Sequence, residues 1–535
     1  MLPWVVARSL SVIDEAQLQT LGAQELRETV RALMADLTSK SAAIERHERE
    51  AAFNRATIDK LTHEMAVLKR LKFAAKSEAF TAEQKSLLEE TIDADLAALA
   101  QEIEQRAPAG DKGKGDRKQP KRAALPPQLP RTEFRHEPDS TTCGCGCQLQ
   151  RIGEDVAEKL DYVPGVFTVE RHVRGKWVCK ECQTLVQAPV APHIIDKGIP
   201  TTALLAQVLV AKYLDHLPLY RQEAIFARAG FSLSRSTLAT WVGQCGVQLQ
   251  PLVDALKLEM LGSPVLHADE TPVAMLKPGT GKTHRAYIWS YCTTAYNALR
   301  AVVFEFAEGR GGHNVREFLG LPGEKGWRGK LVCDDFSGYK ACFELGVTEA
   351  GCMAHARRKF HELWANHGSQ VGENALKFFG DLYDIEREVA GVDPPERQRI
   401  RQERSSKVAD ALHQWLVRQR SKVPEGSATA RAIDYSLKRW VALTRFIEDG
   451  DLPIDNNWVE NQIRPIALGR SNWLFAGSLR AGQRAAAIMS LVHSARINGH
   501  EPHAYLKDVM ERLPTQPASQ IAELLPHRWH PSGKT

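Results

Sequence analysis

No run of apolar residues in this 535-residue chain is long enough to cross a bilayer. The N-terminus also lacks the basic start and the apolar length of a signal peptide. The net charge is only +5, so the whole-chain total indicates no partner. These absences predict a cytoplasmic, nucleoid-facing protein with no membrane partner.

The length predicts about three or four domains. A hydrophobic content of 43% and a charged content of 25% are ordinary for a soluble globular protein. The charge is unevenly distributed, because residues 106–131 hold eight Lys and Arg against two Asp among many Gly and Pro. This segment has too little apolar surface to fold, so we predict a disordered basic linker. It is either a solvated tether or a segment that lies along DNA phosphates.

Between residues 26 and 68 the apolar residues follow a 4-3 spacing, and no Pro or Gly interrupts them. Ten of thirteen seam positions are apolar, which predicts a coiled coil of about six heptads. Lys40, His47 and Asn54 on the seam would restrict register and oligomeric state. We therefore predict that region 1–105 is a zipper through which the protein self-associates. The alternative is a long helix packed on its own protein.

Five of the ten cysteines lie in a β-rich segment, residues 132–195. Without a secretory signal, such a cluster indicates metal ligation rather than disulfides. Tetrahedral zinc prefers thiolates on tight turns, so we predict one structural Zn²⁺ held by four of the five. The sequence does not decide which four. The five are Cys143, Cys145, Cys147, Cys179 and Cys182.

Residues 196–260 have a helical pattern. Within them, residues 228–241 resemble a helix, a Gly-containing turn and a second helix capped by Ser234 or Ser236. A helix-turn-helix that binds DNA and a plain helical hairpin that supports the next domain fit this pattern equally well.

Residues 261–480 alternate strongly at first, with strands expected at 263–273, 286–292, 298–306 and 331–334 and helices at 314–319 and 339–345. A short strand is expected near residue 352. The order favours a mixed, ribonuclease-H-like sheet that is interrupted by an α-helical insertion at about 360–450. A C-terminal segment, 481–535, follows. The predicted fold class is multidomain α+β.

Three acids in this region suit a two-metal site. Asp269 and Asp334 are expected on the first and fourth strands, and Glu460 opens an amphipathic helix. Magnesium keeps several waters, so few protein ligands are needed. Two Mg²⁺ or Mn²⁺ ions about 3.5–4 Å apart would stabilise the attacking and leaving oxygens of a phosphodiester reaction. Nearby acids compete for this role, namely Glu270, Asp335 and Asp455.

Basic residues beside the acids are candidate ligands for the phosphates of bound DNA. They are Arg357, Arg358, Lys359, Arg464 and Arg470. Cys352 and His355 form half of a metal site or, as we expect, a structural pair. Trp458 and Trp473 would stack on a displaced base or, as the safer interpretation, pack in the core.

Several of these motifs carry a family resemblance. The chain resembles the DDE transposases of the insertion-sequence-66 family over nearly its full length. The resemblance rests on the zipper, the cysteine segment with Arg151-Ile-Gly-Glu-Asp155, His267-Ala-Asp269-Glu-Thr-Pro272, Asp334 ahead of Gly338-Tyr339, Cys352-Met-Ala-His355-Ala-Arg-Arg-Lys-Phe360, Asp455-Asn-Asn-Trp-Val-Glu460-Asn-Gln-Ile-Arg464-Pro and Ser490-Leu-Val-His-Ser-Ala-Arg496. The chain departs from the family at Asp335, where Gly is common, and in its compressed first cysteine pair.

The resemblance implies a bacterial enzyme that cuts and joins the ends of a mobile element, with Asp269, Asp334 and Glu460 as the catalytic triad. Its partners would be terminal inverted repeats, target DNA and accessory proteins encoded by the element. One alternative is a ribonuclease-H-type nuclease without joining, which would not need the zipper, zinc segment and helix-turn-helix. The other is a catalytically silent DNA-binding regulator, against which the three intact acids argue.

Overall fold

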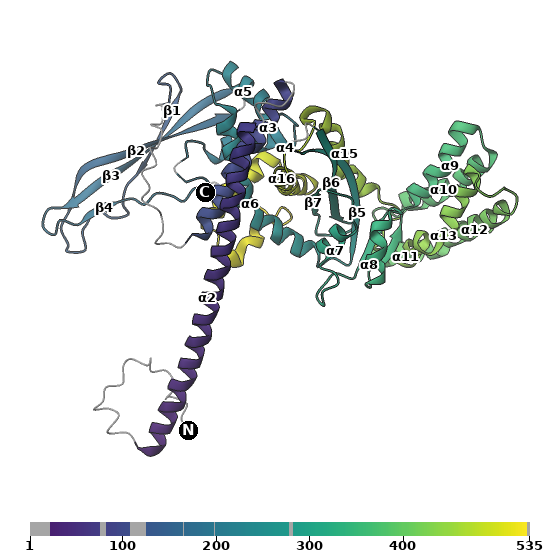
Figure 1. Cartoon of the computed structure of the whole chain (residues 1–535), viewed down its shortest axis with the longest axis horizontal. Coiled ribbons are helices and arrows are strands. Elements are labelled where there is room, and N and C mark those ends of the chain that lie inside the picture. The colour runs from purple at the N-terminus through teal and green to yellow at the C-terminus, as the bar shows by residue number, and fades with distance from the viewer. Residues whose placement is uncertain are drawn as a thin grey trace. The chain divides into compact units, whose positions relative to one another are not determined.

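The computed structural model describes residues 22–74, 82–107, 125–163, 165–196, 198–277 and 282–531. The chain divides into two compact units. One unit comprises residues 1–67 and 102–117, and the other comprises residues 68–101 and 118–535. Figure 1 labels the elements of both units. Within the described ranges, no helix is both long and apolar enough to span a membrane.

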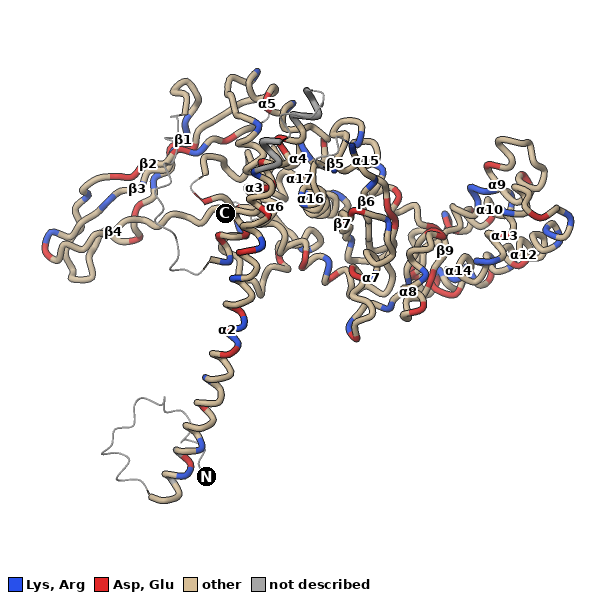
Figure 2. The backbone as a smooth tube through the Cα atoms, viewed as in Figure 1, with Lys and Arg blue, Asp and Glu red and all other residues tan. Residues whose placement is uncertain are grey.

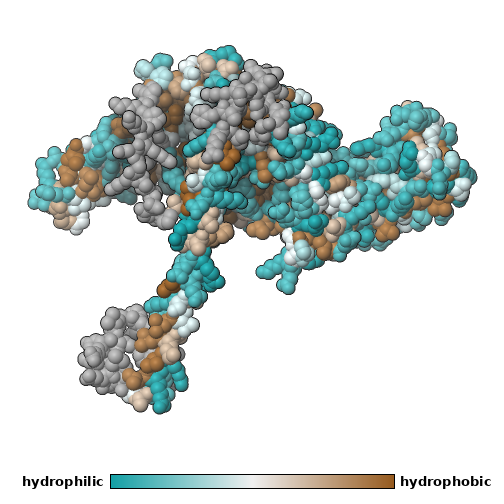
Figure 3. Space-filling model, viewed as in Figure 1, coloured by the Kyte–Doolittle hydropathy of each residue, from teal (hydrophilic) through white to brown (hydrophobic). Residues whose placement is uncertain are grey.

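The first unit is built around α2 (Ala23–Ala74), a single helix of 52 residues. It contains no Pro or Gly, so nothing in its sequence interrupts the backbone hydrogen bonds. Seam side chains in the N-terminal half of α2 are open to solvent, with exposed fractions of 39% for Leu26, 63% for Leu37 and 57% for Ile44, whereas Leu61 farther along is buried. Figure 3 shows hydrophobic surface along this helix. The predicted long N-terminal helix is confirmed, and self-association through its seam stays a prediction.

Helix α3 (Ala82–Arg106) corrects the predicted zipper region 1–105, because most of α3 belongs to the second unit. Its apolar face is buried there, and Leu99 is fully enclosed. A small cluster joins α3 to that unit, formed by Leu87, Leu88, Ile92, Leu276 and Phe475. Heptad spacing identifies a helix, but it does not reveal that the next helix packs on a different partner.

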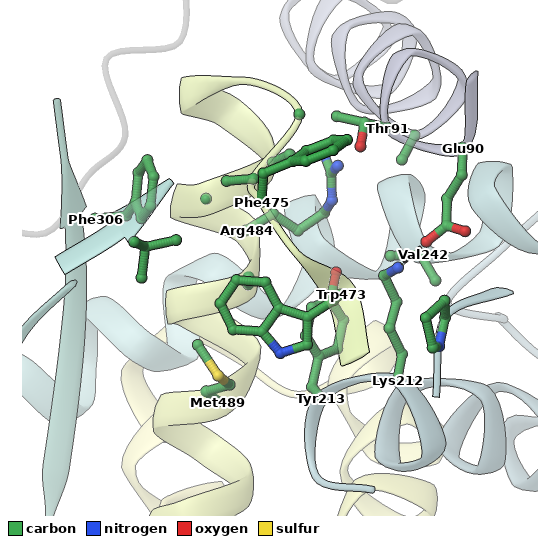
Figure 4. A pocket seen from close by; sticks show the side chains of 18 of the residues that line it. Glu90, Thr91, Lys212, Tyr213, Val242, Phe306, Trp473, Phe475, Arg484 and Met489 are labelled. Atoms are coloured by element: carbon green, nitrogen blue, oxygen red, sulfur yellow. Dashed lines mark hydrogen bonds and ion pairs between the residues drawn. The ribbon is translucent and has the colours of Figure 1, made fainter. Parts of the chain in front are cut away.

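Two acids of α3 form ion pairs inside the second unit. Glu90 pairs with Lys212, and Asp95 lies 2.9 Å from the Arg484 guanidinium. Figure 4 shows Glu90 and Lys212 pointing toward each other beside a cavity of about 100 Å³, with Arg484 and Trp473 on its wall. Because these acids are almost completely enclosed, α3 is an integral part of the second unit.

Most of the predicted basic linker, residues 108–124, lies outside the described residues. Its last residues are ordered. Leu125 is buried, and the Arg131 guanidinium donates to four backbone carbonyls between Leu125 and Leu129. The linker therefore ends before the predicted boundary at residue 131.

A small sheet follows, with strand order β1-β3-β2 and β4 paired to the end of β3. Strands β2 and β3 form a long antiparallel hairpin with a bulge between Arg151 and Gly153, and β1 runs parallel to β3. At its inner end, Tyr162 and Phe167 pack on Phe226 of the neighbouring helices. The strands are β1 (Arg131–His136), β2 (Leu149–Val163), β3 (Val166–Cys179) and β4 (Leu185–Gln187).

Three helices connect this sheet to the main one. They are α4 (Thr202–Tyr213), α5 (Leu219–Arg228) and α6 (Arg235–Met260). The Ser234 side chain caps α6 by accepting a hydrogen bond from the Thr237 N–H. Leu238, Val242 and Leu249 of α6 are among its fully buried residues, so most of this helix supports the core.

The main sheet has the order β7-β6-β5-β8-β9. Its first three strands are antiparallel neighbours, whereas β8 and β9 run parallel to β5. Alternating apolar residues and β-branched side chains produce these strands, as the sequence predicted. The elements are β5 (Val265–Lys277), β6 (Lys282–Thr293), β7 (Val302–Ala307), α7 (His313–Leu319), β8 (Lys330–Cys333), α8 (Lys340–Glu344) and β9 (Thr348–Gly351).

Six α-helices lie between β9 and the next sheet-covering helix, and most of them share a second hydrophobic core with β5, β8 and β9, which includes Val332, Phe360 and Phe379. The fully buried Arg401 pairs with Glu386 at 2.6 Å and donates to three backbone carbonyls. Figure 1 shows these helices grouped together. They are α9 (Met353–His367), α10 (Gln370–Glu388), α11 (Pro394–Ile400), α12 (Ser406–Arg420), α13 (Ala428–Lys438) and α14 (Trp440–Thr444).

The chain then returns to the sheet with α15 (Asn457–Trp473), α16 (Leu479–Ile497) and α17 (Pro502–Arg512). The Ser490 and Ser494 hydroxyls of α16 accept hydrogen bonds from the N–H groups of Phe304 and Val302. The edge of β7 is therefore covered. The coarse prediction of a mixed α+β chain with an N-terminal helix, a cysteine segment and sheets is confirmed.

Candidate functional site

The main sheet brings two of the predicted acids to neighbouring strands. Asp269 lies within β5, and Asp334 directly follows β8. These strands are parallel, and His267 stands opposite Val332. Asp269 lies two residues after His267, and Asp334 lies two residues after Val332. Glu460 lies in the first turn of α15, which packs against β5.

Asn456 fixes the start of α15 to β5. Its side-chain oxygen accepts a hydrogen bond from His267 Nδ1 at 2.8 Å, and its amide nitrogen donates to the Ala268 carbonyl at 3.0 Å. Burial lowers the pKa of His267 to about 4, so the ring is neutral. Glu460 follows one helical turn after Asn456, so these bonds hold its backbone near Asp269.

The three carboxylates interact electrostatically. Burial, the adjacent Glu270, and then Asp334 and Glu460 raise the pKa of Asp269 to about 8. The Glu460 Oε1 atom is buried without a hydrogen-bond partner. Its carboxylate lies 3.8 Å from His355 Nε2 and 3.6 Å from the Arg358 guanidinium. A site in which anions repel one another and a buried oxygen lacks a partner fits a divalent cation.

The carboxylate oxygens are more widely spaced than the thiols described below. Among the described residues, only a cysteine cluster places three or more metal-ligating side chains within 4.8 Å of one another. Asp269, Asp334 and Glu460 therefore share one electrostatic environment without forming a compact ligand cage.

The competing acids have other partners. Glu270 accepts hydrogen bonds from the Tyr339 hydroxyl at 2.7 Å and from Arg310 Nε at 2.6 Å. Asp455 accepts from the Tyr383 hydroxyl at 2.8 Å and from the backbone N–H of Asn457. Asp335 lies 3.6 Å from Arg439.

The predicted phosphate ligands differ in how accessible they are. Arg357, Arg358 and Arg464 are exposed on their helices, and Lys359 Nζ lies 4.5 Å from the centre of the Tyr435 ring. Arg470 instead donates to the Pro272 carbonyl at 2.6 Å, which braces α15 against β5. Figure 2 shows that α9–α13 carry basic and acidic positions side by side.

The remaining predicted residues have structural partners. The buried Cys352 sulfur accepts a hydrogen bond from the Asn456 N–H at 3.2 Å. Trp458 Nε1 donates to the Thr293 carbonyl at 3.0 Å, and Trp473 packs at the edge of the large core. These contacts agree with the structural interpretation of Cys352 and the core-packing interpretation of both Trp residues.

Four cysteines of the small sheet come together. The ligand atoms of Cys143, Cys145, Cys179 and Cys182 all lie within 4.8 Å of one another. Sulfur pairs are separated by 3.2 Å (Cys143–Cys182), 3.6 Å (Cys145–Cys179) and 3.8 Å (Cys145–Cys182), and all four thiols are free. Tetrahedral Zn²⁺ with bonds of about 2.3 Å would place its sulfurs about 3.8 Å apart, so the thiols fit zinc.

The chain is similar to a known protein family and to several bacterial proteins. A model described as "Transposase IS66 family" matches residues 197–484. The uncharacterized protein y4qI of Sinorhizobium fredii is 37% identical over 496 residues, 89% of each chain. The uncharacterized protein y4jD of the same organism is 35% identical over 76% of this chain and 81% of its own. The chain belongs to the IS66 transposase family.

Smaller IS66 models cover other parts of the chain. Residues 140–183 match a "zinc-finger binding domain of transposase IS66", residues 490–527 an "IS66 C-terminal element", and residues 60–134 a "Transposase C of IS166 homeodomain". The predicted family is thus confirmed, and the domains are those of a DNA-binding transposase. The zinc-finger match and the four-cysteine cluster support a structural Zn²⁺.

Two tight turns position these cysteines. Cys143 and Cys145 lie in the turn between β1 and β2, which the bridge between Thr142 and Gln148 closes. Cys179 ends β3, and Cys182 lies in the turn that follows. Cys147 lies outside the cluster, and its backbone carbonyl accepts a hydrogen bond from the Cys143 N–H at 2.8 Å. The structure therefore selects a Cys-x-Cys pair and a Cys-x-x-Cys pair.

We expect about one Zn²⁺ per chain, lost when a cluster thiol is removed. Cys143→Ser should abolish stoichiometric zinc and destabilise the small sheet, because structural zinc supplies folding free energy. Cys147→Ser is the matched control, and it should retain zinc. Metal analysis by mass spectrometry measures both. Equal zinc loss in the two variants would contradict the assigned ligand set.

The sequence alone did not identify residues that hold the acids in position through contacts with other groups. Asn456 is the clearest example, because nothing in the local pattern reveals its contact with a strand 188 positions away. The Glu270–Arg310 ion pair is another. The only sequence signal was that Glu270 is adjacent to Asp269 and that Asn456 lies four residues before Glu460; Arg310 had none.

Proposed function

We propose that this chain is an active DDE transposase that cleaves the ends of its element and joins the 3′-hydroxyl ends to target DNA. The observation that carries the proposal is the shared electrostatic environment of three acids: Asp269 within β5, Asp334 directly after the parallel strand β8, and Glu460 on an anchored helix. Family membership supports the same chemistry.

The sheet supports a ribonuclease-H-like interpretation. Three antiparallel strands precede two parallel ones, and the acids lie on the first and fourth strands in chain order. The helices α9–α14, whose core also includes residues of β5, β8 and β9, fit an insertion before Glu460. We place the catalytic domain at residues 261–480, preceded by the zinc domain (132–195) and the helical segment (196–260).

Asp269, Asp334 and Glu460 would hold two Mg²⁺ or Mn²⁺ ions. Bound there, the ions would activate the attacking oxygen and stabilise the leaving oxygen. The protein's own contribution is positioning: the Phe336 N–H donates to the Asp334 carboxylate at 2.9 Å, and Asn456 holds the first turn that carries Glu460. Arg358, 3.6 Å from Glu460, is placed to contact a phosphate of the bound strand.

The other parts would bring DNA to this site. The zinc domain and the α5–α6 hairpin would contact terminal inverted repeats, and α2 would pair two chains so that two ends are held together. Accessory proteins encoded by the element would assist, and the enzyme would act in the bacterial cytoplasm at the nucleoid.

A two-step assay tests this function. With Mg²⁺, the protein should nick a terminal-repeat duplex taken from the DNA that borders its gene, and then join the freed 3′-hydroxyl to a second duplex. Cleavage without joining would favour a ribonuclease-H-type nuclease. Binding of the repeat without cleavage, in either Mg²⁺ or Mn²⁺, would favour a catalytically silent regulator.

A further inference from the structure

A cavity of about 290 Å³ opens beside Asp334, between the catalytic sheet and the helices α9–α14. Its walls come from the loop after β8, from α8 and from α13. They include Phe336, Lys340, Phe343, Tyr435 and Lys438. Pockets of about this size bind small ligands or parts of larger ones.

The cavity lining carries three acids, Asp334, Asp335 and Glu349, and three cations, Lys340, Lys438 and Arg439. Its two outer acids, Asp335 and Glu349, are both engaged by the nearly buried Arg439. Lys340 and Lys438 are exposed. Within the described residues, neither side chain forms an ion pair or a hydrogen bond. Two cations of the lining therefore have no ion-pair partner among the described residues, while Asp334 belongs to the acidic site that would hold metal ions.

Aromatic surface lies next to these cations. Phe343 and Tyr435 are half-buried at the cavity wall. Lys359 Nζ, 4.5 Å from the centre of the Tyr435 ring, adds a third positive charge behind it. Unpaired cations beside aromatic side chains can bind a single nucleic-acid strand, because phosphates contact the cations and bases contact the rings.

We propose that this cavity binds one nucleotide of the DNA strand beside the phosphodiester that the acids would cleave. Lys340 and Lys438 contact its phosphate, and Phe343 and Tyr435 contact its base. The inference rests on the proposed function, because it needs a DNA strand at Asp334. It also gives α13 a role: the helical segment holds the strand from the side opposite the catalytic sheet.

The test compares Lys340→Ala/Lys438→Ala with a matched control, Lys407→Ala/Lys422→Ala. The control lysines are also exposed and lie outside the cavity lining. Affinity for a fluorescent terminal-repeat duplex is measured without divalent metal over a series of salt concentrations. The cavity variant should bind roughly tenfold more weakly, with a salt slope smaller by about one to two. The control should match the wild type, and Lys340→Arg/Lys438→Arg should restore binding.

A second measurement locates the contact. Replacing each phosphate near the repeat's end by a neutral methylphosphonate should weaken wild-type binding at one or two adjacent positions. The cavity variant should be insensitive at those same positions, because a lost partner makes the two changes non-additive.

The outcomes separate the two proposals. Wild-type affinity and salt slope in the cavity variant would overturn the cavity inference, whatever the enzyme cleaves. Weakened binding by the cavity variant, with insensitivity at the same phosphates, would uphold the inference even if the wild-type protein cut no DNA. The absence of cleavage by the wild-type protein would refute only the proposed catalysis.

Discussion

Asp269→Asn should lower cleavage of the element ends by at least about 10³-fold, which corresponds to about 4 kcal/mol of lost transition-state stabilisation. The amide is nearly the same size as the carboxylate, but it cannot balance the charge of two cations. DNA binding should persist, because Asp269 carries no phosphate contact. Single-turnover cleavage with Mg²⁺ measures the loss, and anisotropy measures binding. Asp410→Asn, exposed on α12, is the matched control and should cleave normally.

The same variant has a stability signature. The pKa of Asp269 is raised from 3.8 to about 8 by burial and neighbouring acids, so the metal-free folded state binds a proton that the unfolded state has released. The stability that this group confers is present at low pH and falls as pH rises between these two values. Asp269→Asn removes that loss, so the metal-free variant should melt higher than the wild type near pH 8. Mg²⁺ should stabilise only the wild type.

Thermal melts with and without Mg²⁺ provide the check. A variant that neither binds DNA nor melts cooperatively would make Asp269 a structural residue. A variant that cuts at the wild-type rate would remove it from the catalytic site.

The strands and acids of the main sheet were predictable because their signals are local. Period-two alternation marked β6, and an acid at the end of a short apolar run marked β8 and Asp334. The parallel pairing of β5 with β8 is a long-range property, and the element order predicted only a mixed sheet. The structure adds the register that places His267 opposite Val332, two residues before each acid.

The choice of zinc ligands could not be predicted from the local sequence pattern. Cys143, Cys145 and Cys147 are equally spaced, so spacing alone could not choose between them. Backbone geometry makes the choice: the turn directs two thiols toward Cys179 and Cys182, while the carbonyl of Cys147 closes the turn on Cys143. Asn456 and the acids of α3 were missed for a related reason, because their partners lie far away in the sequence.

Removal of residues 1–67 and removal of residues 1–105 should have opposite effects on folding. The shorter deletion takes most of α2 and follows the boundary between the two units. The remaining protein should fold and nick single ends. It should join paired ends poorly, because the zipper that would hold two chains together is gone. Sedimentation should show a smaller assembly than the full-length protein forms.

The longer deletion also removes α3, and the expected losses are large. Burial of Leu87, Leu88, Ile92 and Leu99 stabilises the fold by about 1.5–3 kcal/mol for each side chain. Loss of Glu90 and Asp95 leaves Lys212 and Arg484 without their partners, and breaking a buried pair costs about 3–5 kcal/mol. The total is comparable to or larger than the usual stability of a domain, about 5–15 kcal/mol, so the protein should not fold stably.

A point substitution tests the packing of α3 on the second unit without removing any residues. Asp95→Ala in the full-length chain should lower the free energy of unfolding by about 3–5 kcal/mol, because it strands the Arg484 charge in the interior. Glu104→Ala, on an exposed position of the same helix, should change it by less than about 0.5 kcal/mol. Denaturant melts measure both. Equal stability of the two variants, together with a folded 106–535 fragment, would mean that α3 belongs to the zipper region and that this region ends at residue 105.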